Sequence, residues 1–348
     1  MSKETTVCIT GASGFIASHI IKQLLEQGYK VKGTVRGDIS KYTYLDELPG
    51  ANVLLELVQA DLLTEGSFDE IIEGCDYVLH TASPYFVNVK DPQTELVDPA
   101  VKGTLNVLAA CAKAKSVKRV VLTSSMAAIT DEPNNNKVFT EEDWNTLSSL
   151  KRNPYYYSKV QAEKSAWDFV KSNNTDYDLV VINPFVVIGP SLGPGLNESN
   201  KIFKDMLSGG YPTVMSINWG LVDVRDVAKS HILAMETTSA SGRYLVSNEA
   251  MEMKDVVSFL KNNGFNKYRL PLVNLASPVG DKIMKILSYT QPKGSATYLR
   301  SHLSKKMQYN NSKVKRDLGL EFVTAKDSII DTLDDLIKWK HLPDKRNK

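Results

Sequence analysis

The first half of the chain alternates short, apolar, β-rich runs with longer stretches whose apolar residues recur at helical spacing. The strand-like runs are TVCIT (6–10), YKVKGTVR (29–36), NVLLELVQAD (52–61), DYVLH (76–80), KRVVLTSS (118–125) and YDLVVIN (177–183). Between them, FIASHIIKQLLEQ carries an apolar helical stripe that Gly28 closes, and residues 96–115 predict another helix. Strands that alternate with helices of this length form parallel sheets covered on both faces. We therefore predict an α/β fold, a Rossmann-type doubly wound parallel sheet.

The rhythm changes after Asn183. GPSLGPG (189–195) is loop-rich, and the later segments are short and irregular, although GRYLVSN (242–248) could return to the sheet as a late strand. Such a tail usually packs over the carboxyl edge of the sheet, where ligands bind. We expect a larger sheet domain, residues 1–189 plus about 222–248, and a smaller, discontinuous C-terminal substrate lobe, about 190–221 and 249–348.

Composition narrows the class of protein. The chain has 348 residues, 42% hydrophobic and 24% charged, with a net charge of +2 and no basic stripe with interleaved aromatics. These values are ordinary for a globular protein and argue against nucleic-acid binding. No apolar run approaches the roughly 18 residues of a membrane span, and MSKETTVCITG leaves no room for a signal peptide. We therefore expect a cytoplasmic protein with no nucleic-acid or membrane partner, and the sequence leaves both monomer and dimer open.

The three cysteines, Cys8, Cys75 and Cys111, lie in or beside apolar runs. Their odd number and scattered positions fit buried free thiols in a reducing compartment better than a disulfide framework. No metal-ligand spacing links them to the five histidines, so we expect no metal site.

The turn after the first strand has the glycine pattern of a dinucleotide site. It reads TGASGFIAS, with Gly11, Gly14 and Ala17 at three-residue spacing. Glycine lets the backbone fold back and approach a pyrophosphate, and the following helix offers unpaired N–H groups and a positive dipole end. A purely structural strand–turn–helix is the alternative, but the place of this turn in an alternating chain favours dinucleotide binding.

The end of the second strand favours NADP over NAD. An NAD site places an acidic residue there to hold the ribose 2′-hydroxyl. In GTVRGDISK this position is Arg36, and Lys41 follows shortly. An arginine fork suits a 2′-phosphate, which a carboxylate would repel. Asp38 and a merely solvated Arg36 keep the alternative open, but we predict NADPH.

The stretch NPYYYSKVQAEKSAW (153–167) carries an acid–base pair. Pro154 marks a helix start, and Tyr155 and Lys159, four residues apart, share a face. A phenol has an ordinary pKa near 10, and a nearby ammonium lowers that pKa by favouring the phenolate. The pair can therefore donate a proton to a carbonyl oxygen as hydride arrives at carbon.

The proposed proton transfer also needs a hydroxyl from elsewhere in the chain to hold the carbonyl oxygen. TSSMAA (123–128), at the end of a core strand, supplies Ser124 and Ser125 to hold the carbonyl oxygen. Tyr156, three residues before Lys159, is a weaker candidate for the acid because it breaks the four-residue register. Tyr156 and Tyr157 are expected to be packing residues.

Further segments are QADL (59–62), HTASP (80–84), VKGTLNVLAAC (101–111), RVVLTSS (119–125), YYYSKVQAE (155–163), NPFVVIGP (183–190) and VDVRDVA (222–228). With TGASGFIASHI and TVR, they resemble the extended short-chain dehydrogenases/reductases, in the branch of dihydroflavonol and cinnamoyl-CoA reductases. The resemblance covers most of the chain and is strongest from 5 to 235. It implies an NADPH-dependent reductase of carbonyl groups.

The resemblance also implies residue roles. Tyr155 would be the proton donor, Lys159 would lower its pKa and hold the nicotinamide ribose, and Ser125 would hold the carbonyl oxygen. The implied cofactor contacts run from the adenine to the nicotinamide: Gly11, Ser13, Gly14, Phe15, Ile16, Arg36, Lys41, Asp61, Leu62, Thr81, Ala82, Ser83, Thr123, Ser124, Tyr155, Lys159, Pro184 and Val187.

The expected substrate contacts are largely apolar. Those near the nicotinamide are Phe86, Ser125, Met126, Tyr155, Phe185 and Val186, and those from the second lobe are Leu192, Met206, Met215, Ile217 and Trp219. Such side chains are as often core as pocket. Because no cluster of Arg or Lys accompanies them, we predict reduction of a small, hydrophobic aldehyde or ketone, dihydroflavonol-like carbonyls included.

Departures from related patterns limit the alternatives. RNPYYYSK replaces the NWYCYGK-type segment of cinnamoyl-CoA reductases, which disfavours a CoA thioester. Sugar-nucleotide epimerases share the Ser–Tyr–Lys set but retain NAD, which Arg36 disfavours. A non-catalytic NADP-sensing protein would typically lose Tyr155 or Lys159. His231, after VDVRDVA, is expected to be structural.

Overall fold

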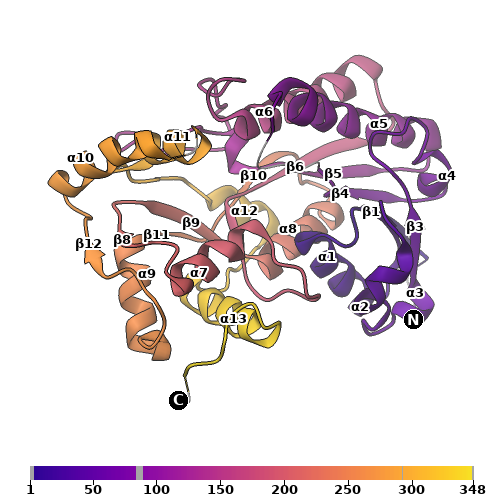
Figure 1. The fold of residues 1–348 in the computed structure, drawn as a ribbon. Helices are drawn as coiled ribbons and strands as arrows, with labels where there is room; N and C mark the ends of the chain where they lie inside the picture. Colours follow the sequence, from indigo (N-terminus) through magenta and orange to yellow (C-terminus); the bar gives the residue numbers. More distant parts are fainter. Residues whose placement is uncertain (1–3, 84–88, 292, 347–348) are drawn as a thin grey trace.

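A computed structural model describes residues 4–83, 89–291 and 293–346. Its centre is a seven-stranded sheet in the order β10-β6-β5-β4-β1-β2-β3, with every neighbouring pair parallel (Figure 1). The strands are β1 (Thr6–Thr10), β2 (Lys30–Val35), β3 (Leu55–Gln59), β4 (Tyr77–His80), β5 (Arg119–Thr123), β6 (Asp178–Pro184) and β10 (Gly242–Val246). This arrangement confirms the Rossmann-type fold, with β10 as the late strand at one edge.

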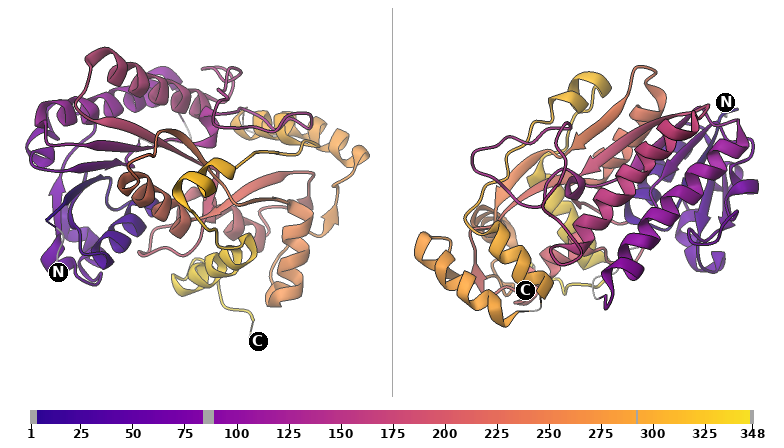
Figure 2. Two further views of the ribbon diagram at one scale, coloured as in Figure 1. Left: turned by 180° about the vertical axis from the view of Figure 1, so that it is seen from behind. Right: turned by 90° about the horizontal axis from the view of Figure 1, so that it is seen from above.

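Helices cover both faces of this sheet because its central strands bury side chains on both sides. In β1, Val7 and Ile9 join one core cluster while Cys8, between them, joins the other. The second of these cores lies under the pair α5 (Asp98–Ala114) and α6 (Pro154–Asn173), which run side by side in Figures 1 and 2. The first lies under the opposite pair, α1 (Phe15–Glu26) and α8 (Val224–Glu236).

A second, smaller assembly lies beside the carboxyl edge of the large sheet (Figure 1). Its strands are β7 (Val186–Ile188), β9 (Asn218–Asp223) and β11 (Glu249–Glu252) in one sheet and β8 (Thr213–Val214) and β12 (Val273–Asn274) in another. Its helices are α7 (Glu198–Ser208), α9 (Met253–Leu260), α10 (Pro278–Leu287), α11 (Lys293–His302) and α13 (Ala325–Lys338).

This assembly has a core of its own, and that core corrects part of the expected substrate site. Met206, Met215, Ile217 and Trp219, expected at the pocket, are at most 6% exposed and pack inside it. None of the four lines the cavity described below. Their side chains close the sheet β11-β9-β7 against α7 and α9, because apolar residues stabilise most where water is fully excluded.

The C-terminal region does not stay with the second assembly throughout. Helix α12 (Ser312–Leu318) returns to the large sheet, where Val314 and Leu318 join the core beneath α8 and β10. The division into two lobes remains a proposal, and this packing places α12 with the larger one.

Short elements complete the described chain: α2 (Thr43–Asp46), α3 (Ala51–Leu54), α4 (Asp69–Ile72) and the turns η1 (Ile39–Tyr42), η2 (Gln93–Val97), η3 (Met126–Ala128), η4 (Lys261–Phe265) and η5 (Ser288–Thr290). The strand expected at 52–61 begins only at Leu55, because Gly50, at φ 84°, starts the helical turn α3. Cys8, Cys75 and Cys111 are buried free thiols. No helix in the described ranges is long and apolar enough to cross a membrane.

Candidate active site

A cavity of about 970 Å³ opens at the carboxyl ends of the central strands. It brings together nearly all the side chains expected at the cofactor and the carbonyl. These are Gly11, Ser13, Gly14, Phe15, Ile16, Arg36, Asp61, Leu62, Thr81, Ala82, Ser83, Thr123, Ser124, Ser125, Met126, Tyr155, Lys159, Pro184, Phe185, Val186 and Val187. Lys41 and Leu192 instead line a neighbouring cavity of about 350 Å³. Phe86 lies outside the described residues.

The glycine turn forms a tight cradle at one end of the cavity. Gly11 has φ +71°, and a Cβ atom there would lie 3.0 Å from the Cβ of Ala82. The N–H of Gly14 donates to the Gly11 carbonyl at 2.8 Å, which folds the turn back before α1. The first turn of α1 contains no acidic residue. Its positive end therefore faces the cavity without a competing charge, as a pyrophosphate requires.

A buried hydroxyl anchors the segment that follows β4 to this turn. The Thr10 Oγ1 accepts the N–H groups of Thr81 and Ala82, each at 3.1 Å. Its proton is therefore left for Nδ1 of His80, 2.7 Å away. Burial lowers the pKa of His80 to about 3, so the ring is neutral and can accept that proton. The network fixes residues 81–83 beside the glycine turn.

Charges at the end of β2 favour the predicted NADP. Arg36 is exposed and lines the main cavity. The Asp38 carboxylate caps η1, where it accepts the N–H and the hydroxyl of Ser40. Asp38 lines neither cavity. The site therefore presents a cation where an NAD site would present a carboxylate.

The predicted acid–base pair stands on the first turns of α6. The Lys159 ammonium lies 5.8 Å from the ring centre of Tyr155 and donates to Ser83 Oγ at 3.0 Å. Burial lowers the pKa of Lys159 to about 8, against the opposing charge of Glu163. Tyr156 also lines the cavity and packs edge-on against Tyr155, with ring centres 6.0 Å apart.

The start of α6 is held by a carboxylate that sequence reasoning missed. Asp131 is 1% exposed and accepts from Asn153 Nδ2 at 2.8 Å and from Arg152 Nε at 2.7 Å. Asn153 adopts a left-handed conformation, φ 49°, immediately before Pro154. Because such a conformation costs energy outside glycine, the bonds to Asp131 stabilise this helix start and so position Tyr155.

Glu163 is a second buried carboxylate that the sequence analysis did not single out. Its oxygens accept from Ser124 Oγ at 2.5 Å, Asn183 Nδ2 at 2.8 Å and Arg243 Nε at 2.6 Å. Glu163 lies one helical turn after Lys159, so spacing alone could have placed it on the same face. It ties α6 to β5, β6 and β10, directly behind the predicted catalytic side chains.

The two serines have different surroundings. Ser124 directs its hydroxyl to Glu163. Ser125 accepts the N–H of Ala127 at 3.1 Å, which caps η3. An oxygen that accepts in this way still has its own proton to donate. Ser125 therefore suits the predicted role of holding a carbonyl oxygen, and Ser124 does not.

His231 supports the site from behind. It is fully buried, and its Nδ1 donates to the Val227 carbonyl at 2.7 Å. Its Nε2 lies 2.6 Å from Thr123 Oγ1 and accepts that hydroxyl. Both ring nitrogens are occupied, as expected for a structural residue. Among the described residues, no group of three or more His, Cys, Asp or Glu is placed to hold a metal ion.

The second assembly supplies the opposite wall of the cavity. Sequence reasoning did not identify this wall, which comprises Leu196, Asn197, Glu198, Ser199, Ile202, His302 and Met307. Met307 packs in one cluster with Met126, beside Phe185. Met307, Met126 and Phe185 therefore form an apolar patch of the cavity lining, beside polar residues of the same wall.

Comparisons with known proteins agree with this geometry. The model of the NAD dependent epimerase/dehydratase family matches residues 7–247. Cinnamoyl-CoA reductase CAD2 of Medicago truncatula is 48% identical over 262 residues, covering 73% of this chain and 79% of that protein. Dihydroflavonol 4-reductase of Arabidopsis thaliana is 37% identical over 279 residues, covering 78% of this chain and 72% of that protein.

A solved structure extends the similarity over nearly the whole chain. The crystal structure of yeast methylglyoxal/isovaleraldehyde reductase Gre2 complexed with NADPH matches with a TM-score of 0.80 at 30% sequence identity. The match covers 97% of this chain and 99% of that one. The chain therefore belongs to the NAD dependent epimerase/dehydratase family, the extended short-chain dehydrogenases/reductases, and within it is similar to the cinnamoyl-CoA and dihydroflavonol reductases.

Proposed function

We propose that this protein is an NADPH-dependent reductase that transfers hydride to the carbonyl of a small, largely hydrophobic aldehyde or ketone. One observation carries the proposal: Tyr155, Lys159 and Ser125 line the same cavity as the glycine turn and Arg36. The acid–base groups and the cofactor cradle thus open onto one space.

The residues present fit NADPH. Gly11 leaves room for close approach of the pyrophosphate to the backbone, and the guanidinium of Arg36 is positioned for a 2′-phosphate. Asp61 and Leu62 border the expected adenine end, and Pro184 and Val187 the nicotinamide end. NADPH, when bound, supplies the hydride. The name of the yeast relative, complexed with NADPH, supports the choice of cofactor.

The chain's own groups handle the proton. Ser125 donates a hydrogen bond to the carbonyl oxygen and so holds it near Tyr155. As negative charge develops on that oxygen, the Tyr155 hydroxyl donates its proton. Lys159 stabilises the phenolate that remains, because an ammonium nearby favours the charged form of the phenol. Ser83, which accepts from Lys159, fixes the position of that ammonium.

The substrate class rests on the apolar wall around the catalytic end. Met126 and Met307 pack together there, and Phe185 and Val186 lie on the same cavity. The described lining of the cavity contains only two basic side chains, Arg36 and Lys159, apart from His302. The yeast relative is named for small aldehydes, which suits such a site better than a CoA thioester.

The direct test is NADPH consumption, followed by nicotinamide absorbance, over aliphatic aldehydes, aryl ketones, α-dicarbonyls and dihydroflavonols. The proposal expects turnover of at least one class, with formation of the matching alcohol. Tight NADPH binding with no turnover of any carbonyl would instead favour a non-catalytic NADP-binding protein.

Cofactor choice provides a separate prediction. Replacing Arg36 with Asp should weaken NADPH binding by about 10- to 100-fold, since charge-assisted hydrogen bonds to the 2′-phosphate are lost. Dissociation constants for NADPH and NADH, measured by fluorescence titration, check this. Asp38→Asn is the matched control, because Asp38 caps η1 outside the cavity. An unchanged NADPH-to-NADH ratio in Arg36→Asp would contradict the assignment.

The pH dependence of reduction follows from Lys159. Its pKa of about 8 means that the ammonium is charged below that pH and neutral above it. Reductive kcat/KM for NADPH, which reports the free enzyme, should therefore fall above about pH 8, by up to tenfold per pH unit. In Lys159→Arg this fall should move to higher pH, since a guanidinium stays charged. A wild-type profile that stays flat to pH 9.5 would count against the role of Lys159.

A further inference from the structure

The wall contributed by the second assembly contains one buried polar side chain that the proposed mechanism does not use. His302, the last residue of α11, is 5% exposed and lines the main cavity. Its ring stacks on Tyr298 with a centroid distance of 3.9 Å and an interplanar angle of 23°. Stacking and burial together hold this ring in one orientation.

The hydrogen bonds of His302 define its tautomer. Nδ1 lies 3.1 Å from the Tyr298 carbonyl, which can only accept. Nδ1 also lies 2.9 Å from Ser301 Oγ, whose own proton goes back to Thr297 and Tyr298 carbonyls. The proton of the ring therefore resides on Nδ1. Burial lowers the pKa of His302 to about 4, so the ring is neutral near pH 7 and Nε2 is an acceptor.

Nε2 has no donor within the described chain. Both hydrogen bonds that the ring makes with the described residues involve Nδ1. Solvent can reach Nε2, because the buried polar side-chain atoms without a partner in the described chain do not include it. A ligand that fills this part of the cavity displaces that water and must supply a donor in its place. The ring edge that carries Nε2 therefore favours a hydrogen-bond donor in the cavity.

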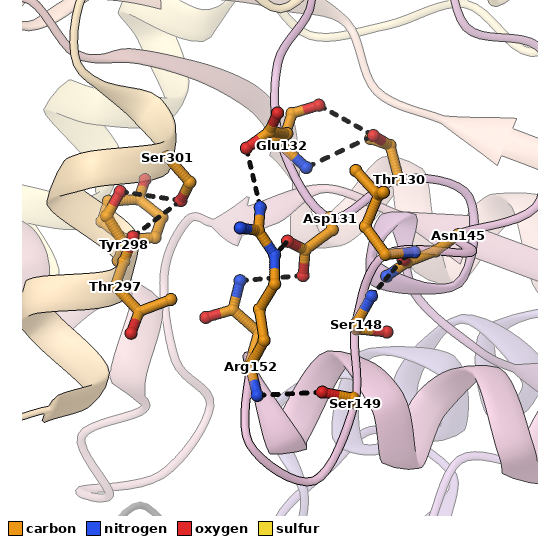
Figure 3. Close-up of polar contacts among 12 residues, drawn as sticks. Thr130, Asp131, Glu132, Asn145, Ser148, Ser149, Arg152, Thr297, Tyr298 and Ser301 are labelled. Atoms are coloured by element: carbon orange, nitrogen blue, oxygen red, sulfur yellow. Dashed lines mark hydrogen bonds and ion pairs between the residues drawn. The ribbon is translucent and has the colours of Figure 1, made fainter.

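The charged groups nearby are already paired with one another. Figure 3 shows Arg152 between Asp131 and Glu132, facing the turn of α11 that carries Tyr298 and Ser301. Arg152 donates to Asp131 and to Glu132, each at 2.7 Å, and Lys305 pairs with the other Glu132 oxygen at 2.9 Å. The two negative and two positive side chains balance one another, so they give no net attraction for a charged ligand, and a neutral donor suits Nε2.

We propose that His302 is a specificity-determining residue whose Nε2 accepts a hydrogen bond from a substrate hydroxyl. The substrate class is then a carbonyl compound with a hydroxyl group remote from the reacting carbon, its apolar body lying against Met307 and Phe185. This inference rests on the proposed reductase function and names the substrate of that same site.

The test compares pairs of carbonyl compounds that differ only in that hydroxyl. Suitable pairs are straight-chain aldehydes of increasing length with and without a terminal hydroxyl, and aromatic aldehydes with and without a para-hydroxyl. For the pair of matching length, wild-type kcat/KM should favour the hydroxylated member by about tenfold or more, since a built hydrogen-bonding site discriminates in this way.

Two variants separate the contribution of the Nε2 acceptor from the contribution of ring packing. His302→Phe keeps the stacking on Tyr298 and removes Nε2, so the preference should fall to within about twofold while turnover of the non-hydroxylated member persists. His302→Gln places an amide oxygen near the position of Nε2 and should restore part of the preference. A general loss of packing would lower turnover of both members alike and leave their ratio unchanged.

Each outcome of this test either supports or overturns the inference about His302. A wild-type enzyme that reduces carbonyls but shows no hydroxyl preference for any pair overturns the inference, as does a preference that survives in His302→Phe. If His302→Phe does not fold, the wild-type ratios and His302→Gln still decide. Absence of NADPH turnover on every compound would overturn the proposed function itself, which is a separate result.

Discussion

Replacing Tyr155 with Phe is expected to lower kcat/KM for carbonyl reduction by about 10²- to 10⁴-fold, which is the usual contribution of a positioned general acid. The variant loses one oxygen atom and keeps the ring that faces Lys159. The oxygen of the substrate would then carry its negative charge without a proton donor, although Ser125 remains. Steady-state NADPH oxidation with the best carbonyl substrate measures the loss.

Two controls make this result specific. NADPH binding by Tyr155→Phe, measured by fluorescence titration, should stay within a few-fold of wild type because the cradle at Gly11 is intact. Tyr157→Phe is the matched substitution, since Tyr157 lies in the same tyrosine run but not on the cavity. Equal activity in Tyr155→Phe and Tyr157→Phe would remove Tyr155 from the mechanism, and a selective loss in Tyr156→Phe would assign the role to its neighbour.

The largest effect on stability is expected from Arg243→Met, which should lower the free energy of unfolding by about 3–5 kcal/mol. Arg243 is 7% exposed and pairs with Glu163, which is 1% exposed. Its guanidinium also donates to the Glu141 and Asp143 carbonyls, at 2.8 and 2.6 Å. The variant would leave a buried carboxylate without its cation. Chemical denaturation followed by circular dichroism gives the difference.

A double variant distinguishes charge burial from lost packing. Arg243→Met combined with Glu163→Met removes both charges, and much of the stability should return, because an apolar pair can replace a buried ion pair. Arg316→Met, which removes an exposed arginine paired with the half-buried Asp317, should leave the free energy of unfolding nearly unchanged. If Arg243→Met is no less stable than Arg316→Met, the central role given to the Glu163 network is wrong.

The fold could be predicted because its signals are local. The central strands of the large sheet are buried on both faces and read as short runs rich in apolar residues, and helices such as α1 show an apolar stripe of their own. Even β10, far along the chain, could be recognised in the sequence, as the segment GRYLVSN. Residues 52–54 were misjudged as strand because a run this short does not reveal whether it will form part of α3, and the left-handed Gly50 decided it.

The site could be predicted only where its residues follow strand ends or helix spacing. Tyr155 and Lys159 could be predicted because residues four apart share one face of a helix. The glycine turn could be predicted because the spacing of its small residues is itself a local pattern. The bond from Ser124 to Glu163 and the bond from Arg243 to Glu163 join residues 39 and 80 positions apart, which no local pattern encodes. His302 is still more remote in sequence from the predicted catalytic residues Ser125, Tyr155 and Lys159.

The apolar side chains of the second lobe show a different limit of prediction from sequence, which is that core and pocket residues look alike. Met206 and Trp219 were expected at the pocket and pack in the core, whereas Ile202 and Met307 line the cavity. The same free energy of water exclusion favours both environments, so composition does not separate them. Only the packing of α7 against the sheet β11-β9-β7 determines which face of the helix meets the ligand.

The central claim, that this cavity transfers hydride from NADPH to a carbonyl, is tested most directly by following the hydride itself. The protein is incubated with a reducible carbonyl and NADPH deuterated at both C4 positions of the reduced ring, and the product is analysed by mass spectrometry. The account predicts an alcohol with one deuterium on the former carbonyl carbon, formed in step with NADPH oxidation. Tight NADPH binding without labelled alcohol from any carbonyl would contradict it.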